Sequence, residues 1–138
     1  MKCINEMKIQ FISKSSNEGF ARVAVAAFVA QLDPTLDEIS DIKTIVSEAV
    51  TNSIVHGYKD SLGIVYITSK IYDNGRVRIT VRDKGCGIED INKAMEPLYT
   101  SCDSGERAGM GFTIMQNFSD NLKVYSKIGT GTRVVMER

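Results

Sequence analysis

The N-terminal part of the chain carries one strand pattern followed by a helical pattern. Met7, Ile9 and Phe11 alternate with polar residues, which predicts a strand with one buried face. From residue 17 the apolar positions follow three-to-four spacing and fill more than half of the helix circumference. Such a helix is either deeply buried or shared with a partner chain. Asp33-Pro34 should end it, because proline disfavours helical angles in the preceding residue.

Arg22 interrupts the apolar surface of this first helix. An arginine on an apolar face can anchor an interface, so Arg22 is the candidate partner-binding residue. An ion pair with Glu18, one turn earlier, is the alternative. The wide apolar surface and a strand edge near residues 7–11 together predict a homodimer formed by the N-terminal segment.

A second helix is predicted from Leu36 to His56. Thr35 and Glu38 have the spacing of a capping box at its start, and Gly57 suits its C-terminal end. The apolar positions expected to face the core are Leu36, Ile39, Ile42, Val46, Ala49 and Val50, flanked by Ile45 and Ile54.

A hairpin is predicted next, with strands over residues 64–72 and 77–81 joined at Asn74-Gly75. The second strand alternates cleanly between apolar and polar residues, which gives it one core face and one polar face. Asp83 is expected at the end of this second strand.

The C-terminal part alternates between short elements and turns. A short helix is predicted over residues 88–95, and residues 98–107 have the polar composition of a mobile lid. A helix over residues 112–118 and strands over 122–125 and 133–136 complete the chain. The expected class is α/β: a two-layer sandwich in which helices cover one face of a mixed, mainly antiparallel sheet.

Composition narrows the function classes. A chain of 138 residues with 43% hydrophobic content fits one domain, so residues 1–138 are expected to form a single unit. The 17 basic and 17 acidic side chains cancel, and this balance argues against direct nucleic-acid binding. No apolar run approaches the roughly 20 residues of a membrane span, and no secretion signal is apparent, so we expect a cytoplasmic protein with no membrane contact. Cys3, Cys86 and Cys102 match neither a disulfide framework nor a zinc site.

Glu48, Asn52 and His56 are spaced four residues apart, which places them on one face of the second helix. They form either a solvated polar stripe or part of a site, because an unpaired buried carboxylate or amide is costly. A metal held by Glu48 and His56 is a poor match, since a divalent ion that carries phosphates prefers oxygen ligands such as Asn52.

Asp83 lies just before Gly85-Cys86-Gly87, at a strand end where ligands commonly bind. A buried aspartate there can accept a hydrogen bond from an amino group such as that of adenine. Cys86 stands between the two glycines, which leaves redox sensitivity open.

Gly109 and Gly111 have dinucleotide-fingerprint spacing, but they follow a polar loop and lack a third glycine. As a lid hinge that opens a helix they make more sense, because the first-turn amides favour an anion. No Walker loop occurs anywhere in the chain. The turn at residues 129–132 reads either as a plain hairpin or as part of a site. Together these elements make a nucleotide site the leading hypothesis.

The ordered motifs resemble the ATP-binding fold shared by DNA gyrase, Hsp90 chaperones, histidine kinases and MutL. The residues that carry this resemblance are Glu48-x-x-x-Asn52, Asp83-x-Gly85-x-Gly87, Gly109-x-Gly111 and Gly131-Thr132. Within that superfamily, nearly the whole chain resembles the sporulation anti-sigma-F factors, which are small serine protein kinases. The stretches of residues 20–23, 26–35, 47–52 and 109–115 fit that family.

The resemblance implies a role for each site residue, with ATP and Mg²⁺ as cofactors. Asn52 would coordinate magnesium, Asp83 would read the adenine amine, and Glu48 would take the proton from the attacking hydroxyl. The remaining implied roles are the adenine pocket for Gly85, Gly87 and, through water, Thr132; the lid hinge for Gly109 and Gly111; and charge neutralisation for Arg107.

The resemblance also implies the partners: a sigma factor that is bound and inhibited, and an anti-anti-sigma protein that is phosphorylated on serine. Two alternatives stay open. One is a stress-response anti-sigma kinase of the same superfamily, and the other is a non-catalytic module that sequesters its partner in an ATP-dependent way without transferring phosphate. A detached histidine-kinase ATPase domain is a third, although the chain shows no long helical hairpin bearing a phosphorylatable histidine.

Overall fold

The computed structural model describes residues 1–95 and 111–138, which form helices layered on a sheet. Within these residues the sheet has five strands in the order β1-β2-β3-β5-β4. Their bounds are β1 (Cys3–Ile12), β2 (Ile64–Tyr72), β3 (Val77–Asp83), β4 (Asn121–Lys127) and β5 (Gly131–Glu137). All four neighbouring pairs of these strands are antiparallel. The expected class is confirmed, and the described part of the sheet is antiparallel throughout.

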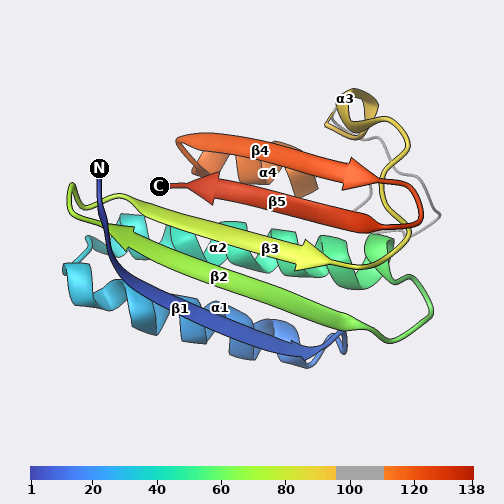
Figure 1. The fold of residues 1–138 in the computed structure, drawn as a ribbon. Helices are drawn as coiled ribbons and strands as arrows, with labels where there is room; N and C mark the ends of the chain where they lie inside the picture. Colours follow the sequence, from blue (N-terminus) through green and yellow to red (C-terminus); the bar gives the residue numbers. More distant parts are fainter. Residues whose placement is uncertain (96–110) are drawn as a thin grey trace.

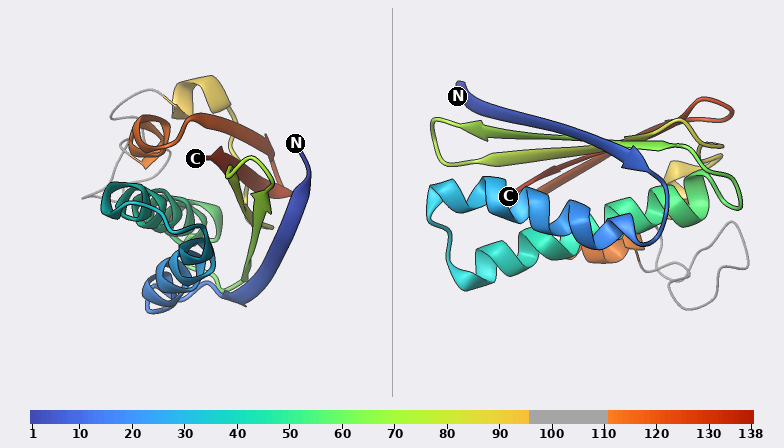
Figure 2. Two further views of the ribbon diagram at one scale, coloured as in Figure 1. Left: turned by 90° about the vertical axis from the view of Figure 1, so that its left-hand side faces the viewer. Right: turned by 90° about the horizontal axis from the view of Figure 1, so that it is seen from below.

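The helices lie on one face of this sheet (Figures 1 and 2). They are α1 (Asn17–Val29), α2 (Leu36–Asn52) and α4 (Gly111–Phe118), while the short α3 (Ile91–Ala94) lies near β4. The core fills the space between these layers, where the side chains that the sheet turns toward the helices are buried. No described helix covers the opposite face of the sheet (Figure 2). None of the described helices is both long and apolar enough to cross a bilayer.

The first helix ends as its sequence predicts. After a short 3₁₀ turn (Ala30–Leu32), Asp33 takes a left-handed conformation with φ of 52° immediately before Pro34. One side of α1 is buried, but Phe20 and Val23 on the other side are 56% and 59% exposed. This helix is therefore not enclosed within the described part of the chain.

The predicted capping box starts α2. The Thr35 hydroxyl accepts the Glu38 backbone N–H at 3.1 Å, and the Glu38 carboxylate accepts the Thr35 N–H at 3.0 Å. The expectation that Leu36 faces the core is wrong, because its side chain is 86% exposed. Leu36 is the first residue of the helix, and apolar spacing alone does not tell where along a helix the core begins.

The last turn of the second helix differs from the prediction. Residues Ser53–Gly57 form a short π-helix, in which the Tyr58 N–H donates to the Ser53 carbonyl at 2.9 Å. Gly57 is thus the final residue of the π-helix rather than a cap beyond an α-helix. Single π-turns of this kind are often found at functional sites.

The strands match their patterns closely. Asn74-Gly75 forms the turn of the β2–β3 hairpin, with Gly75 at φ of 83°. Buried and less buried residues alternate along β3, which confirms its single core face. The two C-terminal strands are each longer than predicted, and the helix expected over residues 88–95 is shortened to Ile91–Ala94. The expected lid at residues 98–107 lies outside the described residues.

Candidate functional site

Glu48 is buried on α2, with only 6% of its surface exposed. The first residue of α4 lies against it, since a Cβ atom added to Gly111 would be 3.5 Å from Glu48 Oε2. Asn52 follows Glu48 by one helical turn and is half-buried. The polar face predicted for this helix is therefore buried at Glu48 and half-buried at Asn52, and its Glu48 end lies next to the first residue of α4.

Asp83 is the second buried carboxylate, with 3% exposed. It ends β3 directly opposite Thr132 on β5. The Gly85 N–H donates to Asp83 Oδ1 at 2.9 Å. Burial raises the pKa of Asp83 above its ordinary value, and the neighbouring polar groups of Gly85, Ser53 and Thr132 oppose that rise.

Glycines allow the end of the second helix to contact the loop after β3. A Cβ on Gly57 would lie 2.8 Å from Asp83 Oδ2, and a Cβ on Gly85 would lie 2.1 Å from the Gly57 carbonyl oxygen. That carbonyl accepts the Cys86 N–H at 2.8 Å. The segment that carries Asn52 and the segment that carries Asp83 are thus joined at a contact that any larger residue would obstruct.

The other side of the Asp83 loop packs on the β4–β5 hairpin. Gly87 has φ of 81°, and a Cβ there would lie 2.3 Å from the Lys127 carbonyl oxygen. The Thr132 hydroxyl lies 2.8 Å from the Ser126 hydroxyl, which accepts the Ile88 N–H at 2.7 Å. The turn predicted as either a plain hairpin or a site therefore lies beside Asp83.

Four residues that hold this arrangement were missed by reasoning from the sequence: Ser53, Gly57, Tyr58 and Ser126. The Tyr58 hydroxyl donates to the Ile64 carbonyl at 2.6 Å and accepts the Lys84 N–H at 2.7 Å. Ser53 had one available signal, its place directly after Asn52 on the same helix. Tyr58 and Ser126 had none, because no local pattern indicates that their hydroxyls bind Lys84 and Ile88, which are 26 and 38 residues away.

One predicted residue, Arg22, lies apart from this pocket. Arg22 is on α1 and forms the ion pair with Glu18 that was the alternative prediction, at 3.5 Å. Glu18 in turn accepts a hydrogen bond from the Ser47 hydroxyl, next to Glu48 in the chain. Arg107 and Gly109 lie outside the described residues.

The described residues hold no cluster of three or more His, Cys, Asp or Glu side chains able to bind a metal ion. Asn52 can still supply one carboxamide oxygen, a ligand type that Mg²⁺ accepts. An ion there would take most of its other ligands from phosphate and water, which is the usual arrangement for Mg²⁺ with a nucleotide.

Comparison with known proteins gives the family. Residues 14–138 match the model of the histidine kinase-like ATPase domain. The anti-sigma F factor of Clostridium kluyveri is 60% identical to the chain, and the match covers 97% of this chain and 94% of the relative. The anti-sigma F factor of Clostridium botulinum is 62% identical with the same coverage. The chain belongs to the anti-sigma F factor family.

Solved structures with low sequence identity are similar to this chain in fold alone. The structure of the RsbU and RsbW domains of a Mycobacterium tuberculosis protein superimposes with a TM-score of 0.70 at 16% identity. The histidine kinase domain of an Erythrobacter litoralis blue-light activated kinase gives 0.54 at 22% identity. The matches cover 98% and 87% of this chain, which spans 32% and 59% of those proteins. The predicted family resemblance is confirmed.

Proposed function

We propose that this chain is an anti-sigma factor that binds and inhibits a sporulation sigma factor, sigma-F. We also propose that it is an ATP-dependent serine protein kinase that phosphorylates, and so inactivates, an anti-anti-sigma protein. The named relatives and the match to the histidine kinase-like ATPase model support both parts.

The adenine end of the proposed ATP site is the Asp83 pocket. Asp83 would accept the adenine amine, because its carboxylate is a buried acceptor at the end of a rigid strand. Gly85 and Gly87 would shape the pocket, and Thr132 would reach adenine through water. The site would prefer adenine over guanine, because a base with a carbonyl in place of the adenine amine cannot donate a hydrogen bond to the Asp83 carboxylate.

The phosphate end would lie between Asn52 and the start of α4. Gly111 opens that helix, whose first-turn N–H groups and dipole favour an anion. Mg²⁺ held by Asn52 would neutralise charge on the phosphates. Gly109 as a hinge and Arg107 as a neutralising cation remain proposals that rest on the family resemblance.

The position of Glu48 is the observation that supports phosphoryl transfer. Its buried carboxylate lies beside Gly111 and one turn before Asn52, at the proposed phosphate end. The partner's serine oxygen would attack the terminal phosphorus, the bond to the ADP oxygen would break, and the serine proton would pass to Glu48. Nucleotide binding alone needs no base at that place.

Single-turnover phosphorylation of the anti-anti-sigma protein by a Glu48→Gln variant tests the proposal. Glutamine keeps the size and hydrogen bonding of Glu48 but cannot take the proton, so transfer should fall by roughly 100-fold to 10,000-fold. A loose transition state places the loss toward the low end of that range. ATP binding should be retained, and Glu89→Gln, at an exposed site, should behave like the parent.

The possible outcomes separate the alternatives. Transfer at the parental rate would exclude Glu48 as the base, and joint loss of transfer and ATP binding would assign it to the metal or the structure. A parent that binds ATP and sigma-F without any transfer would favour the non-catalytic module. Transfer only with a stress-response partner would favour the other kinase of the superfamily.

We further propose a homodimer formed by the N-terminal segment. Among the described strands β1 lies at an edge of the sheet, pairing only with β2. Phe20 and Val23 are exposed on the neighbouring α1, as is Ile12 at the end of β1. Sedimentation at micromolar concentration checks this assembly, and a monomer would contradict it.

A further inference from the structure

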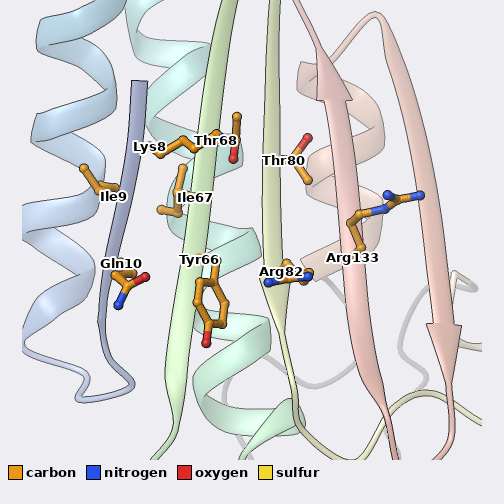
Figure 3. A pocket seen from close by; sticks show the side chains of 9 residues that line it. All are labelled: Lys8, Ile9, Gln10, Tyr66, Ile67, Thr68, Thr80, Arg82 and Arg133. Atoms are coloured by element: carbon orange, nitrogen blue, oxygen red, sulfur yellow. The ribbon is translucent and has the colours of Figure 1, made fainter. Parts of the chain in front are cut away.

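The sheet face opposite the helices carries a row of side chains that the proposed kinase activity does not use. Paired positions on successive strands form this row, which we call the arginine row: Gln10, Tyr66, Arg82, Arg133 and Tyr125. Figure 3 shows its first four members side by side across β1, β2, β3 and β5. Arg82 and Arg133 are paired across β3 and β5, and their side chains lean to opposite sides, toward Tyr66 on β2 and Tyr125 on β4.

Within the described residues, the positive charges in and beside this row are not balanced by nearby acidic groups. The ammonium or guanidinium groups of Lys8, Arg82, Lys84 and Arg133 have no acidic partner at ion-pair distance in residues 1–95 and 111–138.

Farther along the same face of the sheet, another row of paired positions carries charges that do form ion pairs. There Glu6 pairs with Lys70 at 3.5 Å and Arg78 with Glu137 at 3.0 Å. The end of the sheet that carries Arg82 and Arg133 is therefore the cationic end, although the whole chain has a formal charge of zero.

Tyrosine rings hold these cations in place. The Arg82 guanidinium carbon lies 4.7 Å from the centroid of the Tyr66 ring, and the Arg133 guanidinium carbon lies 4.4 Å from that of Tyr125. The Lys84 ammonium is 5.2 Å from the Tyr66 centroid. A guanidinium stacked on a ring keeps its N–H edge available, and that edge matches a carboxylate in a bidentate way.

A hollow of about 410 Å³ lies beside the arginines. Arg82, Arg133 and Lys8 line it together with the hydroxyls of Thr68 and Thr80 (Figure 3). Hydroxyls can hydrogen-bond to peptide groups, while the cations around them select for negative charge. The hollow thus combines a cationic rim with uncharged hydrogen-bonding groups.

We propose that the arginine row and this hollow are a docking surface for an acidic, extended segment of a protein partner. Carboxylates of that segment pair with Arg82 and Arg133, and its backbone contacts Thr68 and Thr80. Single-stranded nucleic acid fits less well, because cations already cover the tyrosine faces on which bases would stack.

The test measures fluorescence anisotropy of a labelled peptide in which glutamate alternates with serine, mixed with the full chain at low salt. The double variant Arg82→Gln/Arg133→Gln should bind this peptide at least about 10-fold more weakly than the parent. The control Lys14→Gln/Lys43→Gln removes the same charge from exposed sites away from this sheet face and should stay within about twofold of the parent. ATP binding by all of these proteins confirms that they are folded.

A charge reversal gives a second, independent readout. The variant Arg82→Glu/Arg133→Glu should lose the glutamate peptide and gain binding of a matching lysine–serine peptide. No binding of the glutamate peptide by the parent, or equal losses in both glutamine variants, would overturn the proposal. Tighter, arginine-dependent binding of oligothymidylate or of phosphatidylserine vesicles would assign the surface to nucleic acid or membrane instead.

Discussion

The contact between Gly57 and Asp83 makes the shape of the proposed adenine pocket testable by adding one methyl group. In Gly57→Ala the new Cβ would meet Asp83 Oδ2 at 2.8 Å, below the 3.4 Å at which ordinary contacts begin. The φ angle of Gly57 is not positive, so the backbone itself does not oppose alanine. The carboxylate cannot easily turn aside, because it is buried and the Gly85 N–H donates to it at 2.9 Å.

The overlap should lower both the thermal stability of the variant and its affinity for ATP. Overpacking of a close contact costs about 1–3 kcal/mol of unfolding free energy, which for a chain of this size lowers Tm by roughly 3–10 °C. A displaced carboxylate also loses a charge-assisted hydrogen bond to the adenine amine, worth about 1.5–3 kcal/mol, so ATP affinity should fall roughly 10-fold to 100-fold.

The assay pairs a thermal unfolding curve with an ATP titration, and Gly19→Ala is the matched control. Gly19 is inside α1, and a Cβ there would meet only Arg22 Nη2 at 3.9 Å, an ordinary contact. That variant should be slightly more stable than the parent, because alanine favours helix over glycine, and should bind ATP normally. A Gly57→Ala variant with parental stability and ATP affinity would refute the packing argument.

Three further predictions concern single side chains. Asp83→Asn should lose preference for ATP over GTP in competition binding, because an amide can present its donor end to the base; a preference as strong as the parent's would remove Asp83 from adenine recognition. Burial and then the Lys59 charge lower the pKa of His56 below 6.5, so the folded state binds fewer protons than the unfolded state. Stability should therefore fall as pH decreases from about 6.5 toward the lowered pKa, and Tm of His56→Gln should fall less; parallel pH curves would contradict this. Arg22→Ala should lower the free energy of unfolding in denaturant by less than about 0.5 kcal/mol, because its ion pair with Glu18 is partly exposed. The same variant should weaken sigma or anti-anti-sigma binding at least about tenfold. Unchanged binding would mean that Arg22 only forms the ion pair and does not contact a partner.

Local patterns in the sequence determined most of the elements. The capping box of Thr35 and Glu38 and the turn at Asn74-Gly75 involve residues within three positions of each other, so their hydrogen bonds are encoded locally. Alternation along β3 predicted its buried face for the same reason, because a strand turns successive side chains to opposite faces. The ordered motifs also carried the family resemblance that the comparisons confirm.

Tertiary structure alone decided how the site is enclosed. The approach of Gly57 to Asp83 and the bond between Thr132 and Ser126 depend on how a helix end and two strands pack and align. The arginine row could not be predicted from the sequence, because it depends on the strand register that places Arg82 opposite Arg133. Hydrophobic periodicity specifies which face of an element is buried, but it does not specify which residues of other elements that face contacts. These contacts therefore emerge only when the whole chain is packed.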